Sequence, residues 1–324
     1  MAVLTVFAMA LVVLGHCDIT PDYKELWHFK WIYSFHMPLF FFISGFLFCL
    51  TNPAERLRIT SYRAFLKKKT VRLLVPFLFI NTVIFLVKAV LIKDPSIMQH
   101  PTSLTWDSFI YYTLFAPIGF MWFLPALFVI FALVFPFWKF LRCKFERGGV
   151  FLLPIFLLLI VTGRIFTSVT FLQIGSAIHY MPYFIAGMAY CCYKPVVDGC
   201  LTKWRKVLIP VFFVLSVSLL TQGMVAAFCG IIFSLCWTLA VADGISDWIM
   251  KLSGYCYSVF LLSYFPQMFI RGPVAYGFPD INQYVFSSFS FMLGLSIPLC
   301  ICLLYDRLKS RYAFLRYSGI LIGL

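Results

Sequence analysis

Long apolar runs alternate with short polar clusters along the whole chain. Ten of these runs are candidate transmembrane helices, at residues 1–15, 31–50, 73–92, 121–138, 150–166, 177–193, 207–221, 224–242, 255–270 and 284–305. Most approach the roughly 20 residues that an α-helix needs to cross about 30 Å of hydrocarbon, and the shorter ones would tilt or thin the bilayer. Helices are expected because lipid offers the backbone no hydrogen-bond partner. The pattern predicts an all-α polytopic membrane bundle of about ten transmembrane helices.

Two stretches do not fit the pattern of an ordinary transmembrane helix. The segment from Ser103 to Gly119 is polar at its start and too short to span, so we expect an interfacial or re-entrant helix there. The N-terminal run up to Cys17 is similar to a signal peptide, but it lacks a basic start and has bulky His16 before the cysteine. We interpret it as a retained first helix. With no internal repeat or soluble appendage, residues 1–324 are expected to form a single integral membrane domain.

Composition agrees with this interpretation. Hydrophobic residues make up 62% of the chain and charged residues 12%, against about 45–50% and about 25% in typical soluble domains. This excludes a water-soluble fold. The net charge of +14 would suggest nucleic acid as the partner of a soluble protein. In a membrane protein a basic excess first reports orientation, so we expect the lipid bilayer and no nucleic acid as a partner.

The positions of Lys and Arg predict the topology. If the N-terminus is cytoplasmic, 20 of the 26 basic residues lie on the cytoplasmic side: Arg56, Arg58, Arg63, Lys67, Lys68, Lys69, Arg72, Lys139, Arg142, Lys144, Arg147, Lys194, Lys203, Arg205, Lys206, Lys251, Arg307, Lys309, Arg311 and Arg316. The other six lie on or towards the outside: Lys24, Lys30, Lys88, Lys93, Arg164 and Arg271. By the positive-inside rule, both termini are expected in the cytoplasm.

Motifs for several other classes of protein are missing from the sequence. The 11 cysteines show no CxxC spacing and lie mostly in apolar runs, so we interpret them as small buried hydrophobic residues. There is no Walker loop, dinucleotide fingerprint, GxSxG or HExxH motif. ATP-driven transport and soluble-type hydrolase chemistry therefore have no support, and no metal or cofactor is expected.

Two histidines are the leading candidates for chemistry. His16 ends the first predicted span, and His36 lies a few residues into the second span from the same outer side. A short loop between antiparallel neighbours could bring both imidazoles to one depth, where a desolvated imidazole is neutral and can accept a proton. Structural alternatives remain open. His36 could be an interfacial histidine bonded to a carbonyl freed by Pro38, and His16 a helix-end histidine in the headgroup region.

A basic cluster precedes the third span. Lys67, Lys68, Lys69 and Arg72 lie at its membrane entry, and Lys69 and Arg72 are three residues apart on one predicted helix face. These cations could hold a phosphorylated ligand at the cytoplasmic mouth. The alternative is a stop-transfer cluster that meets anionic lipid.

Other polar and aromatic positions are weaker candidates. Trp122 and residues 180–183 are typical of aromatic-belt and packing positions. His179 is either a third functional histidine or a helix start. Arg164 and Arg271 lie towards the predicted outer face, where an acidic sugar or a lipid phosphate could meet them, although a snorkelling arginine is commoner.

Four motifs carry a resemblance to a known family. LVVLGH at 11–16, IYSFHMPLFFFISGFLF at 32–48, KKKTVRLLVPFLF at 67–79 and MWFLPALF at 121–128 have the order and spacing of the acyltransferase 3 family. The chain most resembles its bacterial sugar and exopolysaccharide O-acetyltransferases. The remainder of the chain agrees mainly in hydropathy and helix count.

The resemblance implies a reaction and its participants. It implies transfer of an acetyl group from cytoplasmic acetyl-CoA, the co-substrate, to a hydroxyl of a surface glycan or lipid-linked saccharide, by a multi-pass protein of the bacterial inner membrane. His16 matches the catalytic histidine of the family. Lys69 and Arg72 replace its Arg-x-x-Arg pair, so with Lys68 they are the expected donor-binding residues. We expect His36 to assist His16, which would act as a general base or form a transient acetyl-histidine.

The sequence also departs from the family pattern. The basic residue that usually stands eleven positions before the histidine falls on Thr5, and Ser263 and Tyr264 occupy a stretch where many members have a histidine. The first span is short, so either the start is assigned too late or part of the donor-binding end is lost. A transporter or flippase of acyl groups or lipid-linked sugars, or a glycan polymerase, would have similar hydropathy but would lack the motif order.

Overall fold

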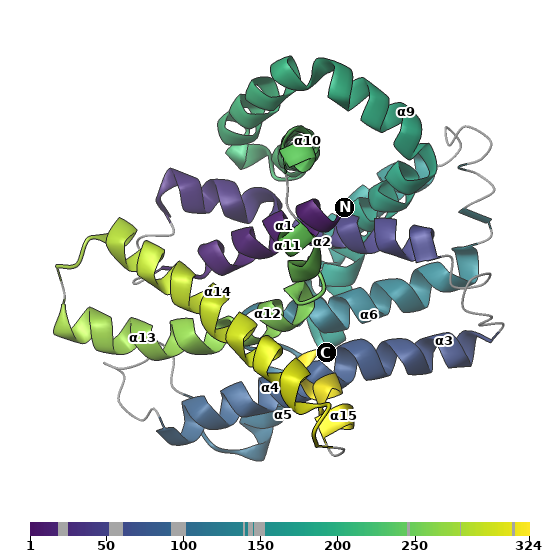
Figure 1. Ribbon diagram of the computed structural model, residues 1–324. Coiled ribbons are helices and arrows are strands. Elements are labelled where there is room, and N and C mark those ends of the chain that lie inside the picture. Colours follow the sequence, from purple (N-terminus) through teal and green to yellow (C-terminus); the bar gives the residue numbers. More distant parts are fainter. Residues whose placement is uncertain are drawn as a thin grey trace. The chain divides into compact units, whose positions relative to one another are not determined.

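All regular secondary structure in the described part of the computed structural model is helical (Figure 1). The structure describes residues 1–18, 25–51, 61–91, 102–138, 140–141, 145, 153–244, 247–278, 280–312 and 315–324. The α-helices are α1 (Ala2–Gly15), α2 (Trp27–Thr51), α3 (Tyr62–Lys69), α4 (Val75–Leu86), α5 (Trp106–Leu114), α6 (Phe123–Val134), α8 (Leu153–Ile165), α9 (Ile174–Ser218), α10 (Met224–Val241), α11 (Asp247–Leu252), α12 (Cys256–Leu262), α13 (Tyr264–Gly277), α14 (Gln283–Leu308) and α15 (Leu315–Ser318). The all-α prediction is confirmed.

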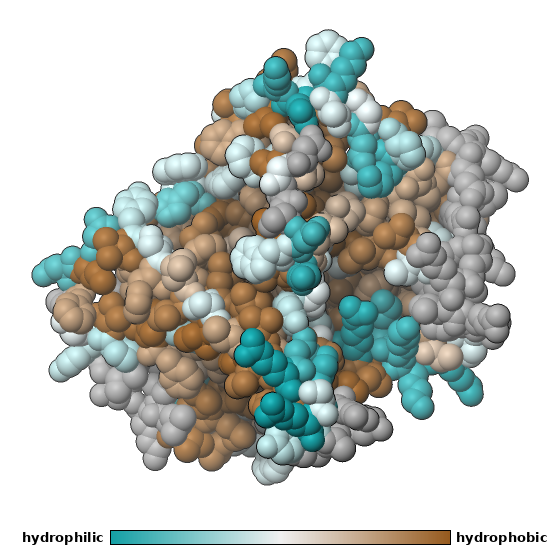
Figure 2. Space-filling model, in the orientation of Figure 1, coloured by the Kyte–Doolittle hydropathy of each residue, from teal (hydrophilic) through white to brown (hydrophobic). Residues whose placement is uncertain are grey.

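Several helices have the length and composition of membrane spans. Within the described ranges, five stretches qualify: Trp27–Thr51, Tyr62–Val90, Gly119–Phe137, Met224–Val241 and Gln283–Leu308, and α1 is a shorter apolar helix. Hydrophobic side chains, brown in Figure 2, cover much of the face shown. Apolar surface of this extent needs lipid to cover it. The chain is an integral membrane protein, whereas its orientation and the count of about ten spans stay predictions.

Some predictions concern residues that the structure does not describe. These are the ends of the spans 73–92 and 150–166 and the loop cations Lys24, Arg56, Arg58, Lys93, Lys139, Arg142, Lys144 and Arg147, together with the side chains of Arg164 and Arg316.

The stretch between residues 193 and 207 is helical, although the sequence suggested a loop. α9 runs for 45 residues without interruption, so the predicted spans 177–193 and 207–221 belong to one helix. Lys194 pairs with Asp198 one turn further along, and such pairs stabilise a polar helical turn. Hydropathy finds the ends of apolar runs but does not distinguish a polar helical turn from a loop.

The predicted span 255–270 consists of two helices. α12 ends at Leu262 and α13 begins at Tyr264. Pro266 has no N–H to donate to the carbonyl of Leu262, so the helical hydrogen-bond ladder is interrupted at this point.

The chain divides into two compact units. Unit 1 comprises residues 1–39, 86–104 and 199–324, and unit 2 comprises residues 40–85 and 105–198. The first half of α2 belongs to unit 1 and its second half to unit 2.

In unit 1, α1 is the central buried helix. It contacts α10, α11, α12 and α14, and Leu4, Ala8 and Val12 are completely buried. A helix that is apolar on all sides is stable only when it is surrounded in this way. α13 and α14 lie side by side (Figure 1), and Gly294 of α14 leaves the space that Gln267 of α13 occupies.

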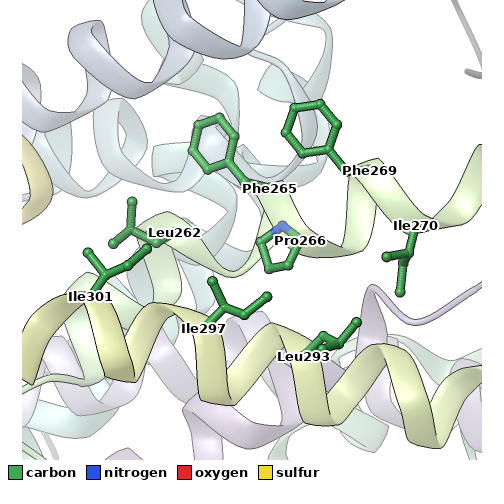
Figure 3. A pocket seen from close by; sticks show the side chains of 8 residues that line it. All are labelled: Leu262, Phe265, Pro266, Phe269, Ile270, Leu293, Ile297 and Ile301. Carbon is green, nitrogen blue, oxygen red and sulfur yellow. The ribbon is translucent and has the colours of Figure 1, made fainter.

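The two faces of α13 differ in character. One face carries Tyr264, Gln267 and Arg271, and Gln267 and Arg271 donate hydrogen bonds to the last turn of α1 or the residues after it. The other face is apolar and lines a cavity of about 380 Å³ against α14 (Figure 3). The walls of this cavity include Phe265, Pro266, Phe269, Ile270, Leu293, Ile297 and Ile301.

In unit 2, the second half of α2 packs closely on the first half of α9. A Cβ atom at Gly45 would lie 1.9 Å from the carbonyl oxygen of Phe184, and one at Gly187 would lie 1.9 Å from that of Phe42. Small residues on both helices let the two backbones approach, as in many membrane helix pairs.

Candidate active site

Several buried polar side chains gather at the end of α1 in unit 1, among them Asp18, Gln267, Gln283 and Ser287. The last carbonyls of a helix have no partner within the helix, and water normally satisfies them. Here the helix ends among other helices, with Cys17 and Asp18 buried directly after it. These carbonyls therefore need side-chain donors from neighbouring elements.

Five side chains supply those donors. The hydroxyl of Tyr33 on α2 donates to the carbonyl of Gly15 at 2.8 Å. From α13 and α14 come the remaining bonds: Gln267 Nε2 to Val13 O at 2.8 Å, Arg271 Nη2 to His16 O at 2.8 Å, Gln283 Nε2 to Cys17 O at 3.1 Å and Ser287 Oγ to Cys17 O at 3.1 Å. Three helices thus fix the backbone on both sides of His16. We call this group of donors the α1 cage.

The imidazole of His16 lies between two tyrosine rings. Its centroid is 6.3 Å from that of Tyr33 and 6.5 Å from that of Tyr264, with interplanar angles of 83° and 89°. These are edge-to-face arrangements, which aromatic rings prefer. His16 is partly exposed while its chain neighbours Cys17 and Asp18 are buried, so the ring is held by its surroundings and still accessible to a ligand.

His36 is completely enclosed, with 3% of its surface exposed. Its Nδ1 lies 2.8 Å from the carbonyl of Ile32, and because a carbonyl can only accept, Nδ1 carries the proton. A neutral ring then has its lone pair on Nε2. The ring of Tyr33 lies 5.0 Å from His36, so Tyr33 contacts both histidines. The carbonyl freed by Pro38 would be that of Ser34, which is not the acceptor found.

An ion pair between Asp18 and Arg271 also belongs to this region. Asp18 is 2% exposed, and its Oδ1 lies 3.3 Å from Nη2 of Arg271, the same nitrogen that donates to His16 O. Arg271, considered from sequence as a snorkelling residue, instead points into the protein and joins α13 to the end of α1.

The predicted donor-binding residues lie in unit 2, around the end of α3. The ammonium of Lys69 lies 3.5 Å from the ring centroid of Phe131 and 5.5 Å from that of Phe65. Aromatic faces attract a cation that has lost part of its hydration. Arg72 and Lys68 are exposed and close enough to Lys69 for electrostatic repulsion. Three cationic side chains are therefore gathered around the end of α3.

A π-helical turn, Thr70–Leu74, follows Lys69 and contains Arg72. Such turns are rare and occur often at functional sites. The wider turn changes the spacing on which the α-helical prediction for Lys69 and Arg72 relied: Lys69 packs inward on Phe131, and Arg72 is exposed.

Other aromatic candidates in unit 2 pack against one another. The ring of Tyr180 stacks on Phe41 at 4.8 Å and lies 5.3 Å from Trp122, and Tyr183 is buried. His179 contacts Tyr180 on α9 of the same unit. These contacts agree with the packing interpretation.

A comparison with protein families adds an independent observation. The model of an acyltransferase domain, Acyl_transf_3, matches residues 3–305. The chain belongs to the acyltransferase 3 family. It is therefore an acyltransferase, and its substrates comprise an acyl donor and an acceptor. No curated protein and no solved structure matches the chain.

Two positions at which this sequence departs from the acyltransferase 3 pattern can be located in the structure. Thr5, at the usual basic position, bonds through its hydroxyl to the carbonyl of Met1. Tyr264, in the stretch where many members have a histidine, places its ring beside His16. The residue type differs, but the position contacts the predicted catalytic histidine.

Most of the α1 cage was missed by sequence reasoning. Tyr33 stands in a motif rich in aromatic residues, and Gln267, Gln283 and Ser287 are isolated polar residues near apolar runs. The available signal was that uncharged polar residues inside a membrane bundle require partners. Their partners are backbone carbonyls, which a sequence pattern does not reveal.

Proposed function

We propose that the chain is an O-acetyltransferase of the bacterial inner membrane, which moves an acetyl group from cytoplasmic acetyl-CoA to a hydroxyl of a surface glycan or lipid-linked sugar. Both termini would be cytoplasmic, and residues 1–324 would form one catalytic domain. The observation that carries the proposal is the fixed, accessible imidazole of His16 inside the α1 cage. An acyltransferase that acts on a hydroxyl needs such a base.

In the proposed reaction, His16 accepts the hydroxyl proton of the acceptor. The acceptor oxygen then bonds to the thioester carbon, and the carbon–sulfur bond to CoA breaks. The thiolate of CoA recovers the proton from His16. General-base catalysis of this kind contributes about 10²- to 10⁴-fold. The Tyr33 ring, which contacts both imidazoles, supports an assisting role for His36.

The phosphates of acetyl-CoA are assigned to Lys69, Arg72 and Lys68. A phosphate needs several charge-assisted hydrogen bonds, and this cluster in unit 2 offers three cationic side chains. The contact of Lys69 with Phe131 supports the assignment, because it orients the ammonium before a ligand arrives.

The direct test uses purified protein in lipid vesicles, supplied with acetyl-CoA labelled in the acetyl group and with a saccharide acceptor. The proposal expects label bound covalently to the acceptor, in alkali-labile form as an ester. Passage of acetyl groups or saccharide across the vesicle without covalent labelling would indicate a transporter or flippase. Lengthened saccharide chains without acetyl would indicate a polymerase.

A further inference from the structure

Several hydrogen-bond donors around His16 are committed to the protein itself. The backbone N–H groups of His16 and Cys17 donate to Val13 O and Leu14 O. The hydroxyl of Tyr33 has one hydrogen, which it gives to Gly15 O. None of these groups has a hydrogen to offer a substrate.

The two cage amides are committed as well. Gln267 Nε2 donates to Val13 O at 2.8 Å and to Cys17 Sγ at 3.3 Å. Gln283 Nε2 donates to Cys17 O at 3.1 Å and to Ser287 Oγ at 2.6 Å. Each amide nitrogen carries two hydrogens, and these contacts use both. The amides therefore hold the end of α1 and have no further donor.

Arg271 is different because a guanidinium has five N–H donors. Its Nη2 makes the bonds to His16 O and Asp18 Oδ1, and its Nε has no hydrogen-bond partner among the described residues. The side chain retains 19% exposure. Arg271 is thus attached to the backbone of His16 and still has donors to give.

The charges around Arg271 also favour a ligand that becomes negative there. Lys88, which is buried, lies close enough to Arg271 for electrostatic repulsion. In the part of the chain that the structure describes, Arg271 thus has a second cation beside it as well as the carboxylate of Asp18. Excess positive charge in a buried region is costly, and a ligand that gains negative charge there would offset the cost.

We propose that Arg271 is a second catalytic residue, whose guanidinium binds the carbonyl oxygen of the acetyl group as that oxygen becomes negative. The inference rests on the acetyl transfer proposed above. When the acceptor oxygen bonds to the thioester carbon, the π electrons of the carbonyl move to its oxygen, and the hydroxyl proton goes to His16. The carbonyl re-forms as the carbon–sulfur bond breaks and the CoA thiolate takes the proton from His16. Arg271 gives up no proton and stabilises the intermediate electrostatically.

The test compares Arg271→Gln with Gln283→Leu. Both variants remove a cage bond to the end of α1, but only the first removes a cationic donor with hydrogens to spare. We expect kcat to fall by about 10²- to 10³-fold in Arg271→Gln and much less in Gln283→Leu, with the KM for acetyl-CoA unchanged in both. Equal losses of kcat in the two variants, or a kcat for Arg271→Gln near that of the wild type, would overturn the proposal.

Chemical rescue covers the case in which Arg271 variants are unstable. Added guanidinium at millimolar concentration should raise kcat in Arg271→Ala and leave kcat in Gln283→Leu unchanged. No rescue of a folded Arg271→Ala protein would count against the assignment.

A parallel His16→Asn variant separates the proposed acetyl transfer from the inference about Arg271. If His16→Asn is fully active, the proposed function fails. If it is inactive while the Arg271 variants keep their kcat, only the inference about Arg271 fails.

Discussion

The residues at the end of α1 have hydrogen-bond partners unlike those of an ordinary helix C-terminus. A helix that ended in water would leave its last carbonyls to solvent. Here Tyr33, Gln267 and Arg271 donate to them from two other helices. Loss of Tyr33 or Arg271 would remove the side-chain donor to Gly15 O or His16 O, and a buried carbonyl without a partner costs about 1–3 kcal/mol. The cage therefore couples stability to the position of His16.

Tyr33→Phe tests that coupling. The variant keeps the ring that contacts His16 and His36 but loses the hydrogen bond to Gly15 O. We expect the free energy of unfolding to fall by about 1–3 kcal/mol, together with a lower kcat, measured by thermal unfolding in detergent and by acetyl transfer. Tyr284→Phe, at a side chain that is 59% exposed, is the control and should change neither value. Wild-type stability in Tyr33→Phe would show that this cage bond contributes nothing.

Lys69→Met tests the donor site. The variant removes the ammonium above Phe131 and with it the proposed charge-assisted bond to a CoA phosphate. Because hydrogen bonds to charged groups contribute about 1.5–3 kcal/mol, the KM for acetyl-CoA should rise by roughly tenfold or more, with a small change in kcat. The KM should also rise with salt in the wild type.

Lys67→Met is the matched control for Lys69→Met. Lys67 is an exposed neighbour on α3 and should alter the KM for acetyl-CoA only slightly. An equally large effect of Lys67→Met would mean that the cluster acts as a general basic surface, as in the stop-transfer alternative.

The predictability of these residues varied with the kind of contact that they make. His16 and the basic cluster were identified by their chemical type and by the family motifs that contain them. Gln267 was missed because its partners are Val13 O and Cys17 Sγ, which lie far away in sequence. Arg271 was noticed, but its inward direction depends on Asp18 and on the path of α13.

At the scale of helices, hydropathy predicted most elements but not where they break or continue. α1, α2, α10 and α14 agree with predicted spans within a few residues. The continuity of α9 was missed because its middle is polar. The break between α12 and α13 was missed because Pro266 lies in an otherwise apolar run.

The packing of α2 on α9 gives a prediction at this scale. Gly187→Ala places a Cβ atom 1.9 Å from the carbonyl oxygen of Phe42, so the backbone of one helix must shift. Overpacking of this kind costs about 1–3 kcal/mol, so the thermal unfolding temperature in detergent should fall.

A control for Gly187→Ala lies on the same helix. A Cβ atom at Gly199 would meet nothing within 4 Å, so Gly199→Ala should raise stability by up to about 1 kcal/mol through helix propensity alone. If both variants behave alike, the close approach at Gly187 is not a determinant of stability.

For the whole molecule, the topology that the distribution of basic residues predicts can be tested with a native probe. Cys200 is exposed on α9, within the stretch expected on the cytoplasmic side. In a variant that retains only this cysteine, a membrane-impermeant maleimide should label inside-out vesicles and not right-side-out ones. Tyr276→Cys, at a side chain that is 77% exposed and on the predicted outer side, should give the opposite result. Labelling of Cys200 from the outside would reverse the predicted orientation.

The proposed acetyl transfer depends above all on His16. The decisive measurement is the rate of acetyl transfer from labelled acetyl-CoA to saccharide by purified His16→Asn protein, beside the wild type and with donor binding measured separately. We expect kcat to fall by about 10²- to 10⁴-fold while acetyl-CoA still binds, because the variant leaves Lys69 and Arg72 unchanged. A His16→Asn protein that transfers acetyl groups at the wild-type rate would contradict the account.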